Sequence, residues 1–187
     1  QEQLSHALFP LGQLSKEEVR SIAREAGLSV ADKAESQDIC FIPDGDYGAF
    51  LRRYTGRDYL PGPFLDQQGH VLGRHTGIVD YTVGQRRGLG VSSSCGRLYV
   101  KEIRPADNTV VLSDNGALFG RTLVAEGLNL IACRQLDGSV RLRARIRYHM
   151  SEQPCTVEQT GPDTIRLTFD QPQRAITPGQ TVALYDG

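Results

Sequence analysis

The length, composition and charge of the chain exclude several classes of protein. It has 187 residues, of which 39% are hydrophobic and 23% are charged, as is typical of a soluble globular protein. The sequence has no apolar run long enough to cross a membrane and no charged-then-apolar signal segment at its start. The formal net charge of -1 argues against binding of polyanions over the whole surface, although it allows a local basic stripe.

The cysteines predict neither a zinc site nor a disulfide framework. They lie far apart and form no Cys-x-x-Cys pair, at positions 40, 95, 133 and 155. This usage fits an intracellular, reduced protein. The first residue is Gln and the only methionine is Met150, so we expect the sequence to be a fragment of a longer chain.

Two helices are predicted in the N-terminal part of the chain. Ser15-Lys16-Glu17-Glu18 is a capping box, and apolar residues at helical spacing follow it until Gly27 ends the helix. Asp44-Gly45-Asp46 provides a turn and an N-cap for a second helix. The Arg52 and Arg53 side chains of that second helix are expected to face outward.

The composition changes near residue 56, where glycine and proline become frequent and the periodicity becomes that of strands. Hairpins are predicted around residues 67–69 and 105–108, with one helical turn over 77–81 and a glycine-rich loop over 84–90. The expected domains are residues 1–55, 56–116 and 117–187.

The last domain is predicted to consist of strands only. The expected strands are about 122–125, 128–133, 140–149, 155–159, 164–169 and 181–185, separated by Gly- and Pro-containing turns. The expected fold class is therefore mostly β, with an N-terminal helical segment, a small β-rich central module and a C-terminal antiparallel β-barrel.

One predicted barrel strand carries arginine at every second position from 141 to 147. Alternate residues of a strand share one face and stand about 6.6 Å apart, close to the phosphate repeat of an extended nucleic-acid strand. A nucleic-acid-binding stripe is one interpretation. The other is a solvated barrel face whose arginines pair with acids such as Glu152 or Asp163.

Two further features before the barrel have more than one interpretation. Arg86 and Arg87 lie among three glycines, where backbone and guanidinium groups can approach a phosphate together, or form a solvated hairpin tip. The glycine spacing matches neither a Walker loop nor a dinucleotide fingerprint. His75 is interpreted as a base or a cap, and a structural histidine is the more common role near the start of a helix.

Cys40 lies between a polar, turn-forming run and an apolar run. Ile39, Phe41 and Ile42 are expected to anchor the loop that carries it. From chemistry alone, a small buried hydrophobic residue is the more common role for such a cysteine. A reactive thiol needs a lowered pKa, whereas the acidic residues nearby would raise it.

Two strings in the sequence are long enough to be specific. One is Ser36-Gln37-Asp38-Ile39-Cys40-Phe41, and the other runs from Gly73-Arg74-His75-Thr76-Gly77 to Tyr81-Thr82-Val83-Gly84-Gln85-Arg86-Arg87-Gly88-Leu89-Gly90. Both resemble motifs of the tRNA-specific 2-thiouridylases of the MnmA type, which replace the 2-oxygen of the wobble uridine with sulfur. The resemblance covers nearly the whole chain and implies a barrel like the second domain of translation elongation factors.

The resemblance also implies roles for individual residues. Cys40 matches the cysteine that carries sulfur as a persulfide. The positions that match tRNA contacts are Arg147, Tyr148 and Gln180, with Arg86, Arg87, Arg143 and Arg145 as weaker candidates. The family is further associated with a disulfide bond, but Cys95, Cys133 and Cys155 do not match its partner-cysteine motif and are expected to be structural.

The cofactors and partners implied by the resemblance belong to the full-length enzyme. It would use ATP and Mg²⁺ bound by an N-terminal part, because this sequence has no Ser-Gly-Gly-x-Asp-Ser phosphate loop, no Asp-x-x-Cys partner motif and no Lys-Asp-Gln-Ser-Tyr-Phe-Leu segment. The fragment alone is therefore expected to be inactive. The implied partners are tRNA at its anticodon region and a sulfur donor such as a cysteine desulfurase or a sulfur-relay protein, with no membrane.

Three functions and two locations remain open. The alternatives to the thiouridylase are a non-catalytic RNA- or protein-binding barrel module with a structural cysteine, and a stand-alone thiol oxidoreductase, which the missing resolving cysteine disfavours. The expected location is the bacterial cytoplasm, and the alternative is a mitochondrion.

Overall fold

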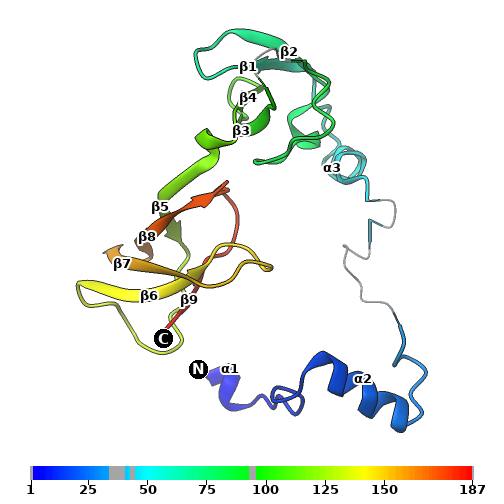
Figure 1. Cartoon of the computed structure of the whole chain (residues 1–187), viewed down its shortest axis with the longest axis vertical. Helices are drawn as coiled ribbons and strands as arrows, with labels where there is room; N and C mark the ends of the chain where they lie inside the picture. The colour runs from blue at the N-terminus through cyan, green and yellow to red at the C-terminus, as the bar shows by residue number, and fades with distance from the viewer. Residues whose placement is uncertain (1, 34–40, 43–44, 93–95, 187) are drawn as a thin grey trace. The chain divides into compact units, whose positions relative to one another are not determined.

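The computed structural model describes residues 2–33, 41–42, 45–92 and 96–186 (Figure 1). The chain divides into two compact units, residues 1–46 and 47–187. Within the described residues, no helix has both the length and the apolar character that a membrane span requires.

The first unit contains two helices, α1 (Glu2–Ser5) and α2 (Lys16–Glu25). The hydroxyl of Ser15 accepts the N–H of Glu18 at 3.3 Å, and the Glu18 carboxylate accepts the N–H of Ser15 at 2.6 Å. The predicted capping box is therefore confirmed. Gly27 follows the helix with a φ of 67°, the left-handed conformation that commonly ends helices.

The second unit begins with α3 (Tyr47–Thr55), which the sequence assigned to the N-terminal domain. Arg52 donates to both carboxylate oxygens of Asp80, at 2.9 and 2.8 Å, and so joins α3 to the 3₁₀ turn η1 (Ile78–Asp80). The expectation that Arg52 faces outward was wrong, because a planar guanidinium binds a carboxylate in this two-point manner. Arg53 is exposed.

The central module is a four-stranded sheet with strand order β2-β1-β4-β3. Both predicted hairpins are confirmed: β1 with β2 and β3 with β4 are antiparallel, whereas β1 and β4 are parallel. The strands are β1 (Gly62–Leu65), β2 (Val71–His75), β3 (Tyr99–Arg104) and β4 (Thr109–Ser113). One side of the sheet buries a core of Phe64, Leu89, Val100, Val110 and Leu112.

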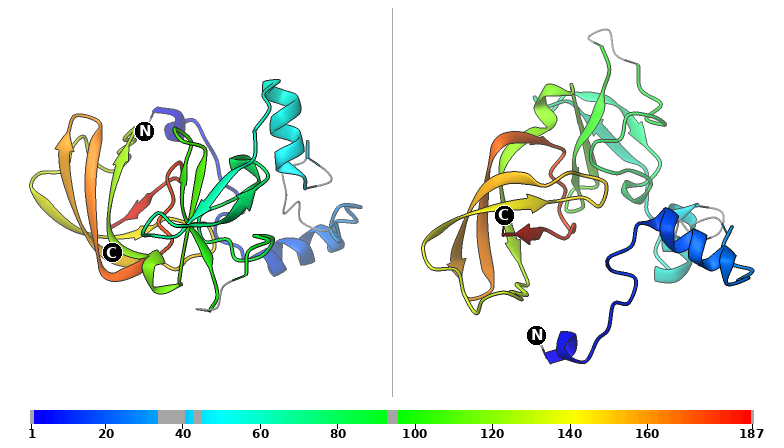
Figure 2. Two further views of the ribbon diagram at one scale, coloured as in Figure 1. Left: turned by 90° about the horizontal axis from the view of Figure 1, so that it is seen from above. Right: turned by 60° about the horizontal axis from the view of Figure 1, so that its bottom comes forward.

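The C-terminal module is a curled, five-stranded antiparallel sheet with strand order β5-β8-β7-β6-β9 (Figure 2). The 3₁₀ turn η2 (Gly116–Leu118) leads into it. Its strands are β5 (Phe119–Glu126), β6 (Ser139–Arg145), β7 (Gln153–Gly161), β8 (Thr164–Arg174) and β9 (Ala183–Tyr185). The concave side encloses a core of Ala144, Ile146, Cys155, Val157, Ile165, Leu167 and Phe169. The mostly β fold class with N-terminal helices is confirmed.

Two predicted strands of this module were wrong in extent or existence. Residues 128–133 form no strand, because Gly127 turns the chain at a φ of 72° and the Asp163 carboxylate accepts the N–H groups of Gly127 and Leu128. The strand predicted over 140–149 ends at Arg145 and is followed by a turn. The division into three domains stays a prediction.

Candidate nucleic-acid interface

The arginines of β6 lie on the outer face of the curled sheet. Ala144 is completely buried in the core, and Leu142 packs against the same core. Because successive residues of a strand point to opposite sides, the side chains of Arg141, Arg143 and Arg145 lie on the other face. The alternation that the sequence showed is therefore an inside–outside pattern.

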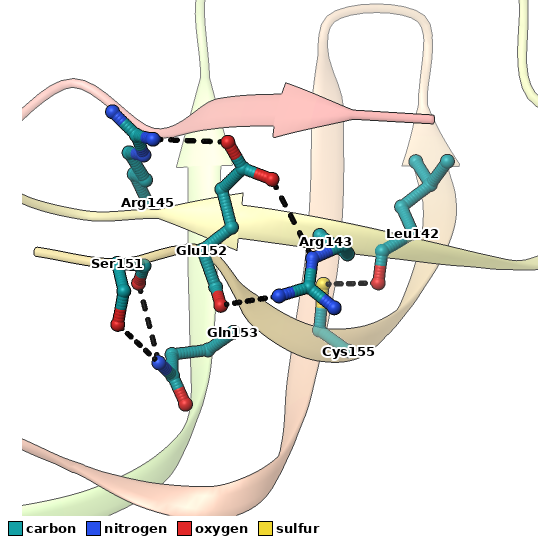
Figure 3. A network of polar contacts seen from close by, with 7 residues as sticks. All are labelled: Leu142, Arg143, Arg145, Ser151, Glu152, Gln153 and Cys155. Carbon is teal, nitrogen blue, oxygen red and sulfur yellow. Dashed lines mark hydrogen bonds and ion pairs between the residues drawn. The ribbon is translucent and has the colours of Figure 1, made fainter. Parts of the chain in front are cut away.

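Glu152 neutralises two of these arginines (Figure 3). Its carboxylate lies 3.4 Å from Nε of Arg143 and 3.0 Å from Nη2 of Arg145, and its backbone carbonyl accepts a further hydrogen bond from Arg143 at 3.0 Å. The guanidinium of Arg145 also lies 5.3 Å from the centre of the Tyr185 ring. The solvated face paired with Glu152 is confirmed for Arg143 and Arg145.

Arg141 is paired with an acid from another strand. Its two terminal nitrogens donate to the carboxylate of Asp170 at 2.8 and 2.7 Å. The hydrogen bonds from Arg141 hold the pKa of Asp170 below its ordinary value and raise the pKa of Arg141. The predicted partner Asp163 was wrong, because its carboxylate accepts backbone N–H groups at positions 127 and 128 instead.

Arg147 and Tyr148 lie beyond the end of β6 and differ from the three strand arginines. The Arg147 guanidinium donates to the backbone carbonyl of Ala175, and within the described residues it forms no ion pair with an acid. Tyr148 is 89% exposed, and its ring meets the His149 ring edge-on with centroids 4.9 Å apart. This turn therefore presents one uncompensated cation and one exposed aromatic ring.

The same carbonyl connects the Arg147 turn to the segment that carries Gln180. The Thr177 hydroxyl donates to the Ala175 carbonyl at 2.9 Å, three residues before Gln180. Gln180 itself is exposed and lines an open cavity of about 1320 Å³. The structure thus brings together the two parts of the chain that carry the three strongest predicted tRNA contacts.

Arg86 and Arg87 are exposed on a loop with a defined internal structure. The Gln85 side chain accepts the N–H of Thr82 at 2.9 Å and donates to the carbonyl of Arg87 at 3.0 Å. Leu89 fixes the far end of the loop in the core of the central module. Neither arginine forms an ion pair in the described part of the chain.

His75 has a structural environment. It is 1% exposed, its Nε2 lies 2.9 Å from the carbonyl oxygen of Asn108, and its ring packs edge-on against Phe64 and Tyr81. Its Nδ1 is buried without a hydrogen-bond partner among the described residues. Such a histidine is inaccessible to a substrate, so its geometry supports the structural interpretation.

The cysteines fall into three groups. Cys155 is buried, donates from Sγ to the Leu142 carbonyl at 3.5 Å, and has a pKa raised by burial, as expected of a structural residue. Cys133 is an exposed free thiol. Cys40, the predicted sulfur carrier, and Cys95 lie outside the described residues. Beside Cys40, Ile42 is 3% exposed, as expected of an anchor, whereas Phe41 is 62% exposed.

Sequence reasoning missed Asp170 and Ala175 at this surface. Both lie on or beside β8, about thirty residues beyond the arginines that they contact. Only the register of β6, β7 and β8 brings them together: Leu142 lies opposite Cys155, and Cys155 opposite Phe169. The alternation of β8 could have placed Asp170 on the outer face, but it could not identify its partner.

Comparison with known protein families gives three matches along the chain. Residues 1–44 match a tRNA methyl transferase HUP domain, residues 48–114 match a tRNA methyl transferase PRC-barrel domain, and residues 120–187 match an aminomethyltransferase β-barrel domain. Together the three matches cover nearly the whole sequence. The last of them accords with the curled antiparallel sheet of β5–β9.

Individual relatives carry a more specific name. The chain is 49% identical over its whole length to tRNA-specific 2-thiouridylase MnmA 1 of Caldanaerobacter subterraneus subsp. tengcongensis, and 46% and 44% identical to the MnmA proteins of Lachnoclostridium phytofermentans and Clostridioides difficile. The chain belongs to the MnmA family of tRNA-specific 2-thiouridylases. It spans about half the length of these curated MnmA relatives, between 51% and 52%.

Proposed function

We propose that this chain is the sulfur-carrying and tRNA-binding part of an enzyme that thiolates the wobble uridine of tRNA. The observation that carries the proposal is the joining of the Arg147–Tyr148 turn and the segment before Gln180 at one backbone carbonyl, that of Ala175. The names of relatives that match the chain along its whole length support the same function.

The exposed groups at this turn suit single-stranded or looped RNA. An uncompensated guanidinium binds phosphate, and an exposed aromatic ring can stack on an unpaired base. Arg147 and Tyr148 supply both within two residues. Arg143 and Arg145 have a smaller role in the proposal, because binding phosphate would have to compete with Glu152.

Sulfur transfer is proposed to proceed through Cys40. Its thiolate attacks the sulfane sulfur of a donor persulfide, which forms Cys40 persulfide and releases the donor as a thiol. The terminal sulfur attacks C2 of the uridine, and the activated 2-oxygen departs with its leaving group. A second thiol then attacks the Cys40 sulfur, which leaves the sulfur on the base and forms a disulfide that an external thiol reduces.

Activation of the uridine is proposed to require ATP and Mg²⁺, bound by residues outside this sequence. In the described residues, no group of three or more His, Cys, Asp or Glu side chains could hold a metal ion, and the sequence has no Ser-Gly-Gly-x-Asp-Ser string. The proposal therefore assigns the binding of both groups to other parts of the full-length enzyme. The proposed sulfur donor is a cysteine desulfurase or a relay protein, and the proposed location is the bacterial cytoplasm.

The proposed tRNA-binding role of the Arg147–Tyr148 turn is tested with Arg147→Ala in the full-length enzyme. We expect the affinity for unmodified substrate tRNA to fall about tenfold, and the slope of log K against log salt to fall by about 0.7–0.9, because one phosphate contact is lost. The readout is a titration at several salt concentrations. Arg166→Ala, which removes an exposed arginine from the outer face of β8, is the matched control and should leave the slope nearly unchanged.

Two results would argue against this tRNA-binding role. An unchanged salt slope in Arg147→Ala would leave the turn as ordinary surface. Equal losses in Arg147→Ala and Arg166→Ala would show a general effect of charge rather than a contact. Binding of tRNA without any thiolation by the full-length protein would favour the alternative of a non-catalytic RNA-binding module.

A further inference from the structure

The side chain of Arg174, at the end of β8, contacts three segments of the chain that precede the barrel strands. Its Nε donates to the side-chain oxygen of Asn115 at 2.9 Å, and its Nη2 lies 3.4 Å from the carbonyl oxygen of Gly84. Its guanidinium carbon lies 5.3 Å from the centre of the Tyr99 ring. The half-buried guanidinium therefore makes hydrogen bonds along its edge and a cation–π contact on its face.

The next residue, Ala175, has an uncommon backbone conformation. Its φ is 52°, in the left-handed region that residues with a side chain rarely adopt, and it is 2% exposed. Its N–H donates to the carbonyl of Leu118 at 2.8 Å, and its own carbonyl accepts the guanidinium of Arg147. The position of Arg147 thus depends on a residue that is held at the junction of the two modules.

The loop with Arg86 and Arg87 starts at the same junction. Gly84 has a φ of 88°, and a Cβ at this position would lie 3.2 Å from Cβ of Ala175 and 3.3 Å from Nη1 of Arg174. The backbone of Gly84 and Gln85 is bonded to Val100 of β3, by hydrogen bonds of 2.7 and 2.9 Å. Glycine at position 84 therefore permits a close approach between the loop and the barrel.

We propose that Arg174 is a positioning residue that holds the Arg86–Arg87 loop and the Arg147–Tyr148 turn as one RNA-binding surface across both modules. This inference rests on the proposed tRNA-binding function. Two of the N–H donor groups of Arg174, on Nε and Nη2, are directed at Asn115 and Gly84, so its proposed role is to position the other arginines rather than to bind phosphate itself. Holding several cationic groups in place before binding lowers the ordering cost of association.

The test compares two replacements of Arg174 in the full-length protein with unmodified tRNA. Arg174→Lys keeps the charge but cannot reach Asn115 and Gly84 with a planar fork, whereas Arg174→Ala loses both charge and contacts. We expect both variants to bind tRNA about tenfold more weakly. We also expect Arg174→Lys to lower the salt slope by about 0.7 or more, because phosphate contacts made by other residues are lost although its own charge remains.

Two additional variants separate positioning from folding and from charge. Asn115→Ala leaves Arg174 in place but removes the acceptor of its Nε, and it should weaken binding severalfold in a protein that unfolds at the same denaturant concentration as the parent. Arg166→Ala removes an exposed arginine from the same strand and should change the affinity less than about twofold. If Arg174→Ala does not fold, Asn115→Ala decides the question.

The possible results distinguish this inference from the function on which it rests. Parental affinity and salt slope in Arg174→Lys would show that only charge is needed, which overturns the positioning role. Parental binding in Asn115→Ala also overturns it, provided that Arg147→Ala weakens binding. If Arg147→Ala and a double Arg86→Ala, Arg87→Ala variant both bind tRNA like the parent, the proposed tRNA-binding function itself is contradicted.

Discussion

The buried end of β2 leaves no space for a side chain at position 62. A Cβ there would lie 2.1 Å from the carbonyl oxygen of Asn108 and 2.7 Å from Nε2 of His75, two atoms that contact each other at 2.9 Å. Asn108 has a φ of 53°, and its side-chain amide donates to the carbonyl of Leu60 at 3.0 Å. Gly62 is thus required by backbone packing.

Replacement of Gly62 by alanine tests this packing. We expect Gly62→Ala to lower the free energy of unfolding by about 2–3 kcal/mol, because a backbone atom cannot move aside as a flexible side chain can. Denaturant titration measures the change. Gly161→Ala is the control, since its new Cβ would meet Thr164 at an ordinary 3.6 Å; equal stability of both variants would contradict the account.

At the scale of elements, the Arg52–Asp80 pair holds α3 against η1. Thr76 adds a third hydrogen bond to Asp80, at 2.8 Å. The hydrogen bonds from Arg52 and Thr76 outweigh the effect of burial and keep the pKa of Asp80 below the ordinary value of about 3.9. Gly48 gives Asp80 access to the helix, because a Cβ there would lie 2.2 Å from Oδ1 of Asp80.

Asp80→Asn should lower the free energy of unfolding by about 1–2 kcal/mol at pH 7, as the charged hydrogen bonds are lost from a partly exposed pair. Because the folded-state pKa of Asp80 is lowered, its charge stabilises the fold above the unfolded pKa, and this contribution is lost as the pH falls through the folded pKa. The difference between parent and variant should therefore shrink below about pH 4. Asp58→Asn, which removes one carboxylate from an exposed position, is the matched control. A constant difference for Asp80→Asn at all pH values would argue against an ionic role.

Local patterns predicted those elements that depend on neighbouring residues. The capping box at Ser15, the two central hairpins and the inside–outside alternation of β6 follow from the sequence, because short-range hydrogen bonds and a period of two determine them. The strand expected over 128–133 did not form, since the carboxylate of Asp163, distant in sequence, takes the N–H groups at 127 and 128. The partner of Arg141, Asp170, was hidden for the same reason, because this pairing depends on strand register.

At the scale of the whole molecule, the sequence motifs predicted more about function than the patterning did. The strings around Cys40 and His75 predicted the family that the comparisons show, whereas chemistry alone favoured a buried cysteine. The structure changes which of the predicted tRNA-binding residues we expect to contribute most. Arg143 and Arg145 are paired with Glu152, and Arg147 is held at a junction that no local pattern revealed.

We propose that Cys40 carries sulfur to tRNA, and mass spectrometry of the full-length enzyme tests this proposal most directly. After incubation with a cysteine desulfurase and cysteine, we expect a mass increase of about 32 Da, one sulfur atom, on the peptide that contains Cys40. Cys133→Ser, which removes an exposed thiol, should keep both this adduct and tRNA thiolation. Cys40→Ser should lose both; no adduct at Cys40, or full thiolation by Cys40→Ser, would contradict the account.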